Sequence, residues 1–267
     1  MTWSPSAQTT LTLLASFYQQ FGNTGNSIPV GSTLPHDTYF GEPDFAAMDR
    51  TERAIGYEFT HDFGGGLTFR QNARYSNFDM LYQQAYVQAG SPTGRYAYLM
   101  RGEAKRMAVD TQLQYETTLK GMQSRSLIGV DYTDDDVYER TWFGTAGAID
   151  INNPIPCGMS CINLSPSTTT DMTQKAAGLY LQEELTINDR WIVTLGGRYD
   201  RVRTDVAGAD TGSKQTAFTK RAGLTYKATD DLSFYGNYSN PLIRWRPITL
   251  RPWMIRNRCA PNNTRRA

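Results

Sequence analysis

Apolar and polar side chains alternate at every second position over long stretches of the chain. One such stretch, residues 191–200, sets the apolar Trp191, Val193, Leu195 and Tyr199 against the polar Thr194, Arg198 and Asp200. Residues 107–119, 215–228 and 231–239 repeat the pattern. A period of two indicates a β-strand with two different faces, whereas a helix would repeat its apolar positions at spacings of three and four. The pattern predicts an all-β protein.

The alternating segments predict about nine strands, with ends placed to within ~2–4 residues. They cover residues 8–19, 52–63, 66–86, 95–119, 122–141, 172–187, 190–205, 215–228 and 231–239. Tight turns at Gly64-Gly65, Lys120-Gly121, Asn188-Asp189 and Asp230-Asp231 alternate with longer polar links near 20–51, 87–94, 142–171 and 206–214. Short turns on one rim and long loops on the other are the layout of outer-membrane barrels. We therefore expect an antiparallel transmembrane β-barrel whose apolar face meets lipid and whose polar face lines the lumen.

Composition agrees with this expectation and narrows the function. Apolar residues make up 39% and aromatic residues 12% of the chain, and Tyr outnumbers Phe by 16 to 11. Tyr suits surfaces that are half apolar and half wet, such as membrane interfaces. No segment approaches the ~18–20 consecutive apolar residues of a spanning helix. The net charge of +1 gives no support for a nucleic-acid partner.

Several short motifs resemble TonB-dependent siderophore receptors, in particular the ferrichrome-receptor type. The most specific is Leu195-Gly196-Gly197-Arg198-Tyr199-Asp200. Others, in chain order, are Gly41-Glu42-Pro43-Asp44-Phe45, Phe69-Arg70-Gln71-Asn72-Ala73-Arg74-Tyr75, Val109-Asp110-Thr111-Gln112-Leu113-Gln114, Gly178-Leu179-Tyr180-Leu181-Gln182-Glu183-Glu184, Asn188-Asp189-Arg190-Trp191, Arg221-Ala222-Gly223-Leu224-Thr225-Tyr226 and Leu232-Ser233-Phe234-Tyr235-Gly236-Asn237-Tyr238-Ser239. The resemblance covers roughly residues 4–239.

The resemblance implies a barrel of about 22 strands, filled by an N-terminal plug, which imports ferric siderophores with energy from TonB. This chain shows no plug-like segment and no TonB box before its first strand. We therefore expect residues 1–240 to be a partial barrel of about nine to ten strands, without a plug domain and inactive alone. From residue 244 onward there are seven arginines and no acidic residue. Residues 241–267 are accordingly interpreted as a divergent Arg-rich tail, disordered or produced by a frameshift.

Siderophore receptors grip an organic chelate with aromatic and polar groups on outer loops, and these groups leave the iron's own ligands in place. The ligand-binding candidates are Trp142, Phe143, Tyr39, Phe40, Tyr96 and Tyr98. Trp142-Phe143-Gly144 resembles an aromatic loop element of the ferrichrome-type receptors. The alternative is that these aromatic residues belong to an interfacial belt or to loop packing. The ferric siderophore would be the transported ligand, and no resident cofactor is expected.

The cysteine pattern favours a disulfide over a metal site. Cys157 and Cys161 lie in a Pro/Ser/Thr-rich stretch without a second pair or a nearby histidine, which is weak as a metal site and suits a loop disulfide in an oxidising compartment. No metal site is expected, since His36 and His61 lack metal-ligand spacing.

The function expected from the sequence is that of a ferric-siderophore receptor and transporter in the cell outer membrane. Its partners would be the ferric siderophore, outer-membrane lipid, and TonB through the missing plug. No GxSxG, HExxH or phosphate-binding loop is present, so the chain is not expected to be an enzyme. The alternatives are a passive porin or adhesin-type barrel without TonB coupling, and a soluble β-sheet binding module.

Overall fold

The computed structural model describes residues 1–25, 34–88, 91, 93–150, 152–208 and 212–240. Their strands form one ten-stranded sheet in which each strand pairs with its neighbours in the sequence, and every pairing is antiparallel. The strands are β1 (Thr2–Ser6), β2 (Thr9–Gln20), β3 (Ala47–Gly64), β4 (Leu67–Val87), β5 (Arg95–Leu119), β6 (Met122–Ala146), β7 (Asn163–Ile187), β8 (Trp191–Val206), β9 (Ser213–Lys227) and β10 (Ser233–Ser239). The prediction of an all-β antiparallel fold is confirmed.

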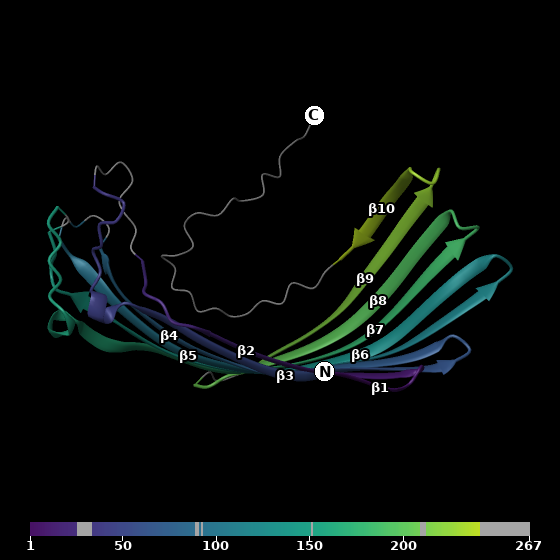
Figure 1. The fold of residues 1–267 in the computed structure, drawn as a ribbon, viewed down its shortest axis with the longest axis horizontal. Coiled ribbons are helices and arrows are strands. Elements are labelled where there is room, and N and C mark those ends of the chain that lie inside the picture. Colours follow the sequence, from purple (N-terminus) through teal and green to yellow (C-terminus); the bar gives the residue numbers. More distant parts are fainter. Residues whose placement is uncertain (26–33, 89–90, 92, 151, 209–211, 241–267) are drawn as a thin grey trace.

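The sheet is a curved wall whose tight turns gather at one end and whose long connections gather at the other (Figure 1). The tight turns follow from backbone chemistry. Lys120 and Gly121 have φ of 50° and 79°, and Asn188 and Asp189 have φ of 51° and 54°. Positive φ at successive turn residues gives the hairpin turn whose twist matches that of the strands, and Gly, Asn and Asp adopt it most easily.

The strands near the long loops extend further than the sequence pattern predicted. β7 begins at Asn163, although residues 163–171 were expected to belong to a link. The Thr-rich segment pairs with the extension of β6, and the register shifts between Thr141 and Trp142, opposite Thr168 and Pro166. Pro lacks the backbone N–H that a regular ladder needs, so a bulge is where a strand accepts it. The short strand β1 was not predicted either.

Two further features complete the description. Two 3-10 turns, η1 (Pro43–Phe45) and η2 (Met159–Cys161), lie in the loops before β3 and β7. Among the described residues, no helix has the length and apolarity needed to cross a membrane. The interpretation of residues 241–267 as a divergent tail falls outside the described residues.

The two faces of the sheet differ in chemistry and in exposure. One face, here called the outer face, carries large apolar side chains that remain exposed, such as Ile55 and Phe218 at 64% and Leu179 at 51%. The opposite, inner face carries polar side chains that are nearly buried, such as Asp200 at 4% and Thr204 at 5%. Since inward curvature crowds the side chains of the concave face, the inner face is the concave one.

The apolar part of the outer face, here called the apolar band, has a membrane's dimensions. On β5 it runs from Met107 to Tyr115, which matches the ~9–11 residues with which a strand crosses a bilayer. Near the tight turns it ends at aromatic residues, where the rings of Trp191 and Tyr226 stack with centroids 4.3 Å apart. Aromatic rings at a band edge are typical of membrane interfaces.

Toward the long loops, the apolar band ends in charges on every strand from β3 to β8. The charged residues that follow the band on the outer face include Arg53, Asp79, Glu103, Lys105, Asp134, Asp136, Lys175, Arg201 and Arg203. They form exposed ion pairs, such as Lys105 with Glu103 at 2.6 Å and Lys175 with Asp134 at 3.3 Å. Beyond this row the strands continue toward the long loops, where the candidate site lies.

Candidate functional site

An aromatic cluster occupies the inner face at the loop end of three strands. Its members come from β4, β5 and β6: Tyr82, Tyr86, Tyr96, Tyr98 and Phe143. Ring centroids lie 5.9 Å apart for Tyr86 and Tyr96, 5.1 Å for Tyr96 and Phe143, and 6.1 Å for Tyr82 and Tyr98. These separations lie in the range of favourable aromatic pairs. Since Phe143 is 40% exposed, part of the cluster presents an open surface on the concave side.

The cluster includes some of the residues singled out in the sequence and omits others. Tyr96, Tyr98 and Phe143 belong to it. Trp142 has the alternation of the outer face, where the guanidinium carbon of Arg140 lies 4.7 Å from the centre of its ring. Ligand contact by any of these residues stays a prediction.

Tyr39 and Phe40 lie in the loop between β2 and β3. Phe40 is fully buried, so its ring lies beneath the surface that a ligand could reach. Burial raises the pKa of Tyr39 above its ordinary value of 10.0. Its hydroxyl is therefore neutral at physiological pH.

Tyr82 and Tyr86 were missed by sequence reasoning, although a signal for them exists. Tyr82-Gln83-Gln84-Ala85-Tyr86 alternates like Tyr96-Ala97-Tyr98 across the next loop. Pairing Tyr86 with Tyr96 places all of these tyrosines on one face. Reading the two segments as a hairpin, rather than separately, would have found the cluster.

Behind the cluster, the long loops pack against the outer face of the same strands. Phe45 of η1 packs with Ala85, Ala97 and Ala146, all of them buried. Residues 34–46, 147–150 and 152–162, together with the strand ends that they cover, are here called the loop platform. The alanines have the alternation of the outer face, so the loops cover this face beyond the apolar band. Small side chains there leave room for the loop backbone.

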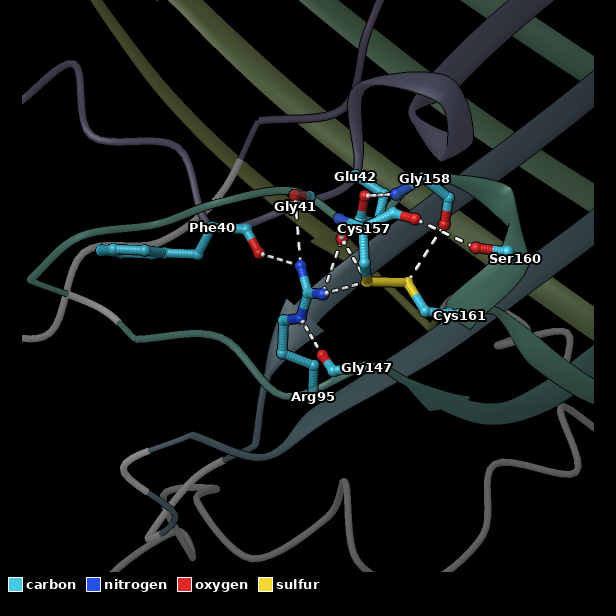
Figure 2. Close-up of a disulfide and its surroundings, with 9 residues drawn as sticks. All are labelled: Phe40, Gly41, Glu42, Arg95, Gly147, Cys157, Gly158, Ser160 and Cys161. Atoms are coloured by element: carbon cyan, nitrogen blue, oxygen red, sulfur yellow. Dashed lines mark hydrogen bonds and ion pairs between the residues drawn. A yellow bond between two sulfur atoms is a disulfide. The ribbon is translucent and has the colours of Figure 1, made fainter.

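A buried arginine at the start of β5 joins both long loops (Figure 2). Arg95 and Glu42 have fully buried side chains, and Nη2 of Arg95 donates to Oε1 of Glu42 at 2.6 Å. Nε of Arg95 donates to the carbonyl of Gly147 at 2.6 Å, and Nη1 donates to the carbonyl of Phe40 at 3.0 Å. A planar guanidinium with five N–H groups suits such a junction, because it can donate in several directions at once.

The carboxylate of Glu42 is held from its other side by the disulfide turn. The backbone N–H of Gly158 donates to Oε2 at 2.8 Å, and that of Cys157 donates to Oε1 at 3.2 Å. Gly158 has a φ of 71°, which glycine adopts without strain. A buried ion pair is stable only when further hydrogen bonds satisfy both charges. Such bonds satisfy both charges here. We call the unit of Glu42, Arg95 and residues 157–161 the latch.

Cys157 and Cys161 are joined by a disulfide within the latch. Their sulfurs and the carboxylate of Glu42 lie within 4.8 Å of one another, the spacing of a possible metal site. However, the sulfurs are bonded to each other and the carboxylate is paired with Arg95. This donor set is therefore committed to the latch.

Farther from the loops, the inner face carries a network of paired polar groups. The guanidinium of Arg198 contacts the carboxylates of Asp131 and Asp200, with 2.7 Å between its Nη2 and Oδ1 of Asp200. The hydroxyl of Tyr180 donates to Asp110. Because the donors and acceptors satisfy one another, the network provides a polar lining, as the interior of an outer-membrane barrel does.

Comparison with known proteins agrees with this architecture. The family described as TonB dependent receptor-like, beta-barrel matches residues 2–247. The chain is 28% identical over 255 residues to the ferrioxamine B receptor of Salmonella typhimurium, covering 90% of this chain and 36% of that protein. It is 27% identical over 281 residues to the ferrichrome outer membrane transporter/phage receptor of Escherichia coli, covering 89% and 37%. The chain thus spans little more than a third of these relatives.

Solved structures support the fold independently of sequence. The ferric-catecholate import receptor Fiu of E. coli, in its closed form, superposes with a TM-score of 0.79 at 16% identity, covering 89% of this chain and 42% of that one. The siderophore receptor PiuA of Acinetobacter baumannii gives a TM-score of 0.74 at 15% identity, covering 89% and 40%. The family consists of receptors rather than enzymes. This chain belongs to the TonB-dependent receptor β-barrels of the bacterial outer membrane.

Proposed function

We propose that the protein containing this chain binds ferric siderophores at its outer end and imports them with energy from TonB. The observation that carries the proposal is the aromatic cluster, which lies on the concave face next to the long loops. A ligand that entered from the loop end would meet these rings before it met the polar network deeper in the wall. The ferric siderophore is the transported cargo, and no resident cofactor takes part.

The cluster suits an organic chelate better than a bare ion. Its rings offer faces for stacking, and the hydroxyls of Tyr96 and Tyr98 offer hydrogen bonds at the ring edge. Such contacts recognise the outside of a chelate and leave the iron coordinated. Coupling to TonB would pass through a plug, as in the family, and the apolar band would contact membrane lipid. These parts of the proposal rest on the family and on the band's dimensions.

A passive porin or adhesin barrel is the alternative. The relatives named above are receptors and transporters, and the matching family is TonB-dependent. Both facts favour the receptor.

Uptake of labelled iron tests the proposal. The full-length protein is expressed in a strain that lacks its own siderophore receptors, and iron is supplied as ferrioxamine B or ferrichrome, with a ferric catecholate for comparison. We expect uptake of at least one chelate, abolished in a TonB-deficient strain. Uptake that persists without TonB would support the passive pore. Residues 1–267 expressed alone are expected to give no uptake, because β1 and β10 are unpaired sheet edges within the described residues.

Variants of the cluster locate the ligand contact. Tyr98→Ala and Phe143→Ala should each weaken chelate binding about two- to tenfold, as expected for loss of an aromatic contact of roughly 0.5–1.5 kcal/mol. Phe218→Ala removes an aromatic side chain from the outer face and serves as the matched control. Equal affinities for all three variants would place the ligand elsewhere.

A further inference from the structure

The latch and the aromatic cluster occupy opposite faces of the same short strand segments. Arg95 and Ala97 face the loop platform, whereas Tyr96 and Tyr98, which alternate with them, face the concave side. On β6, Phe143 belongs to the cluster, and just after β6 the carbonyl of Gly147 accepts the hydrogen bond from Arg95. The two sites are therefore separated by one thickness of backbone.

The latch also fixes segments that the strand ladder does not. Glu42 belongs to the loop between β2 and β3, and Cys157 and Gly158 belong to the loop between β6 and β7. Their hydrogen bonds meet at the carboxylate of Glu42, which also accepts from Arg95, a residue that comes from neither loop but begins β5. The disulfide spans a sequence separation of 4, so it cannot connect distant segments. It instead shapes the turn whose two backbone N–H groups donate hydrogen bonds to the carboxylate of Glu42 (Figure 2).

We propose that the latch of Glu42, Arg95 and the Cys157–Cys161 turn is a positioning device for the aromatic cluster, so that both long loops and the ligand-contacting rings move as one unit. Arg95 is the central positioning residue. Loss of the latch would free the start of β5 and the end of β6, and Tyr96 and Phe143 would lose their fixed separation. The inference deepens the proposed function and rests on it for the identity of the ligand.

Hydrogen exchange and chelate binding, both measured on the full-length protein in detergent, test the inference together. Arg95→Met should raise backbone exchange in residues 38–46, 95–98 and 142–147 at once. It should also weaken binding of ferrioxamine B or ferrichrome, per folded receptor, by roughly five- to a hundredfold, the change expected when two aromatic contacts are lost. Arg95→Lys should not restore binding, since an ammonium group lacks the planar fork. Arg203→Met breaks an exposed ion pair with Asp205 and is the matched control.

The readouts separate a positioning role from a merely structural one. A structural role would lower the amount of folded receptor and leave the affinity of each folded molecule unchanged. If Arg95→Met does not fold, Glu42→Gln combined with Arg95→Met removes both buried charges and is measured in its place. Exchange that rises in residues 38–46 alone, with unchanged affinity, would overturn the inference. If the wild type binds none of the chelates, the proposed function fails, and the exchange pattern at 95–98 and 142–147 still decides whether the latch positions the cluster.

Discussion

The apolar band and the loop platform use the same outer face of the same strands in opposite ways. In the band, large side chains such as Leu113 and Leu179 stay partly exposed, because no loop within the described residues covers them. In the platform, the outer face carries alanines and one buried arginine, because loops of the chain itself cover it. The outer face of the band is thus left to the surroundings of the protein, whereas the outer face of the platform is covered by loops of the chain itself. One strand changes its stabilising partner along its length.

The largest loss of stability is expected from a substitution in the platform. Arg95→Met leaves the carboxylate of Glu42 buried without its cation, which should destabilise the local structure by about 3–5 kcal/mol. The measurement is native-state hydrogen exchange in residues 38–46 and 157–162. The double variant with Glu42→Gln should recover much of the loss, because two neutral side chains need no partner of opposite charge. A double variant as unstable as the single one would show that packing, rather than charge, holds the platform.

A charge introduced into the band should lower stability nearly as much. Leu179→Arg places a guanidinium on the outer face within the apolar band, which should destabilise the membrane-inserted protein by about 2–4 kcal/mol. Thr173→Arg, on the same strand and face but within the row of charges, where it pairs with Asp136, should change stability little. Equilibrium unfolding in lipid vesicles compares the two. Equal effects would mean that the band does not face hydrocarbon.

The disulfide should contribute less than the arginine. Replacing Cys157 and Cys161 together by serine opens a short loop, and chain entropy predicts a loss of about 2 kcal/mol. Protection of residues 152–162 from exchange should fall more than protection of residues 38–46. The reverse order would mean that the turn stabilises the distant loop more than itself.

The smallest expected effect is at the boundary between the two regions. Arg53→Met breaks the exposed pair with Asp79, whose atoms lie 3.4 Å apart, and exposed pairs contribute about 0–1 kcal/mol. The free energy of unfolding in vesicles should barely change, and the change should be smaller still at high salt. A loss comparable to that of Leu179→Arg would show that the row of charges is more than a solvated edge.

The sequence predicted the band and the strand order well, because alternation is a local property that each strand displays by itself. The faces of the long alternating strands could be assigned from spacing, and the neighbouring Cys157 and Cys161 suggested their disulfide. The pairing of Glu42 with Arg95 could not be predicted, since nothing near either residue indicates a partner in another loop. Glu42 was noted only within a family motif, and Arg95 only as the start of a strand.

The difference between the two regions explains why some of the aromatic candidates belong to the cluster and others do not. Alternation places Tyr96 and Tyr98 on one face whatever the loops do. Alternation also places Trp142 on the opposite face from Phe143, its neighbour in β6. Phe40 depends on how the loops fold, because it lies in a loop without a period. Opposite Trp142, β7 carries a bulge. The bulge adds a residue, which changes the face assigned to everything beyond it in β7.

The border between the apolar band and the charges also records the slope of the strands against the membrane. On β4 the border follows Tyr75, and on β8 it follows Tyr199, which lies in register, through Leu179, Val130 and Thr111, with Gln71 of β4. The border therefore shifts four residues along the strand direction, at about 3.3 Å each, while crossing four strand spacings of about 4.8 Å. This gives a tilt of roughly 35°, within the ~35–45° typical of outer-membrane barrels. The pattern of side chains on the outer face thus defines the tilt of the strands relative to the membrane.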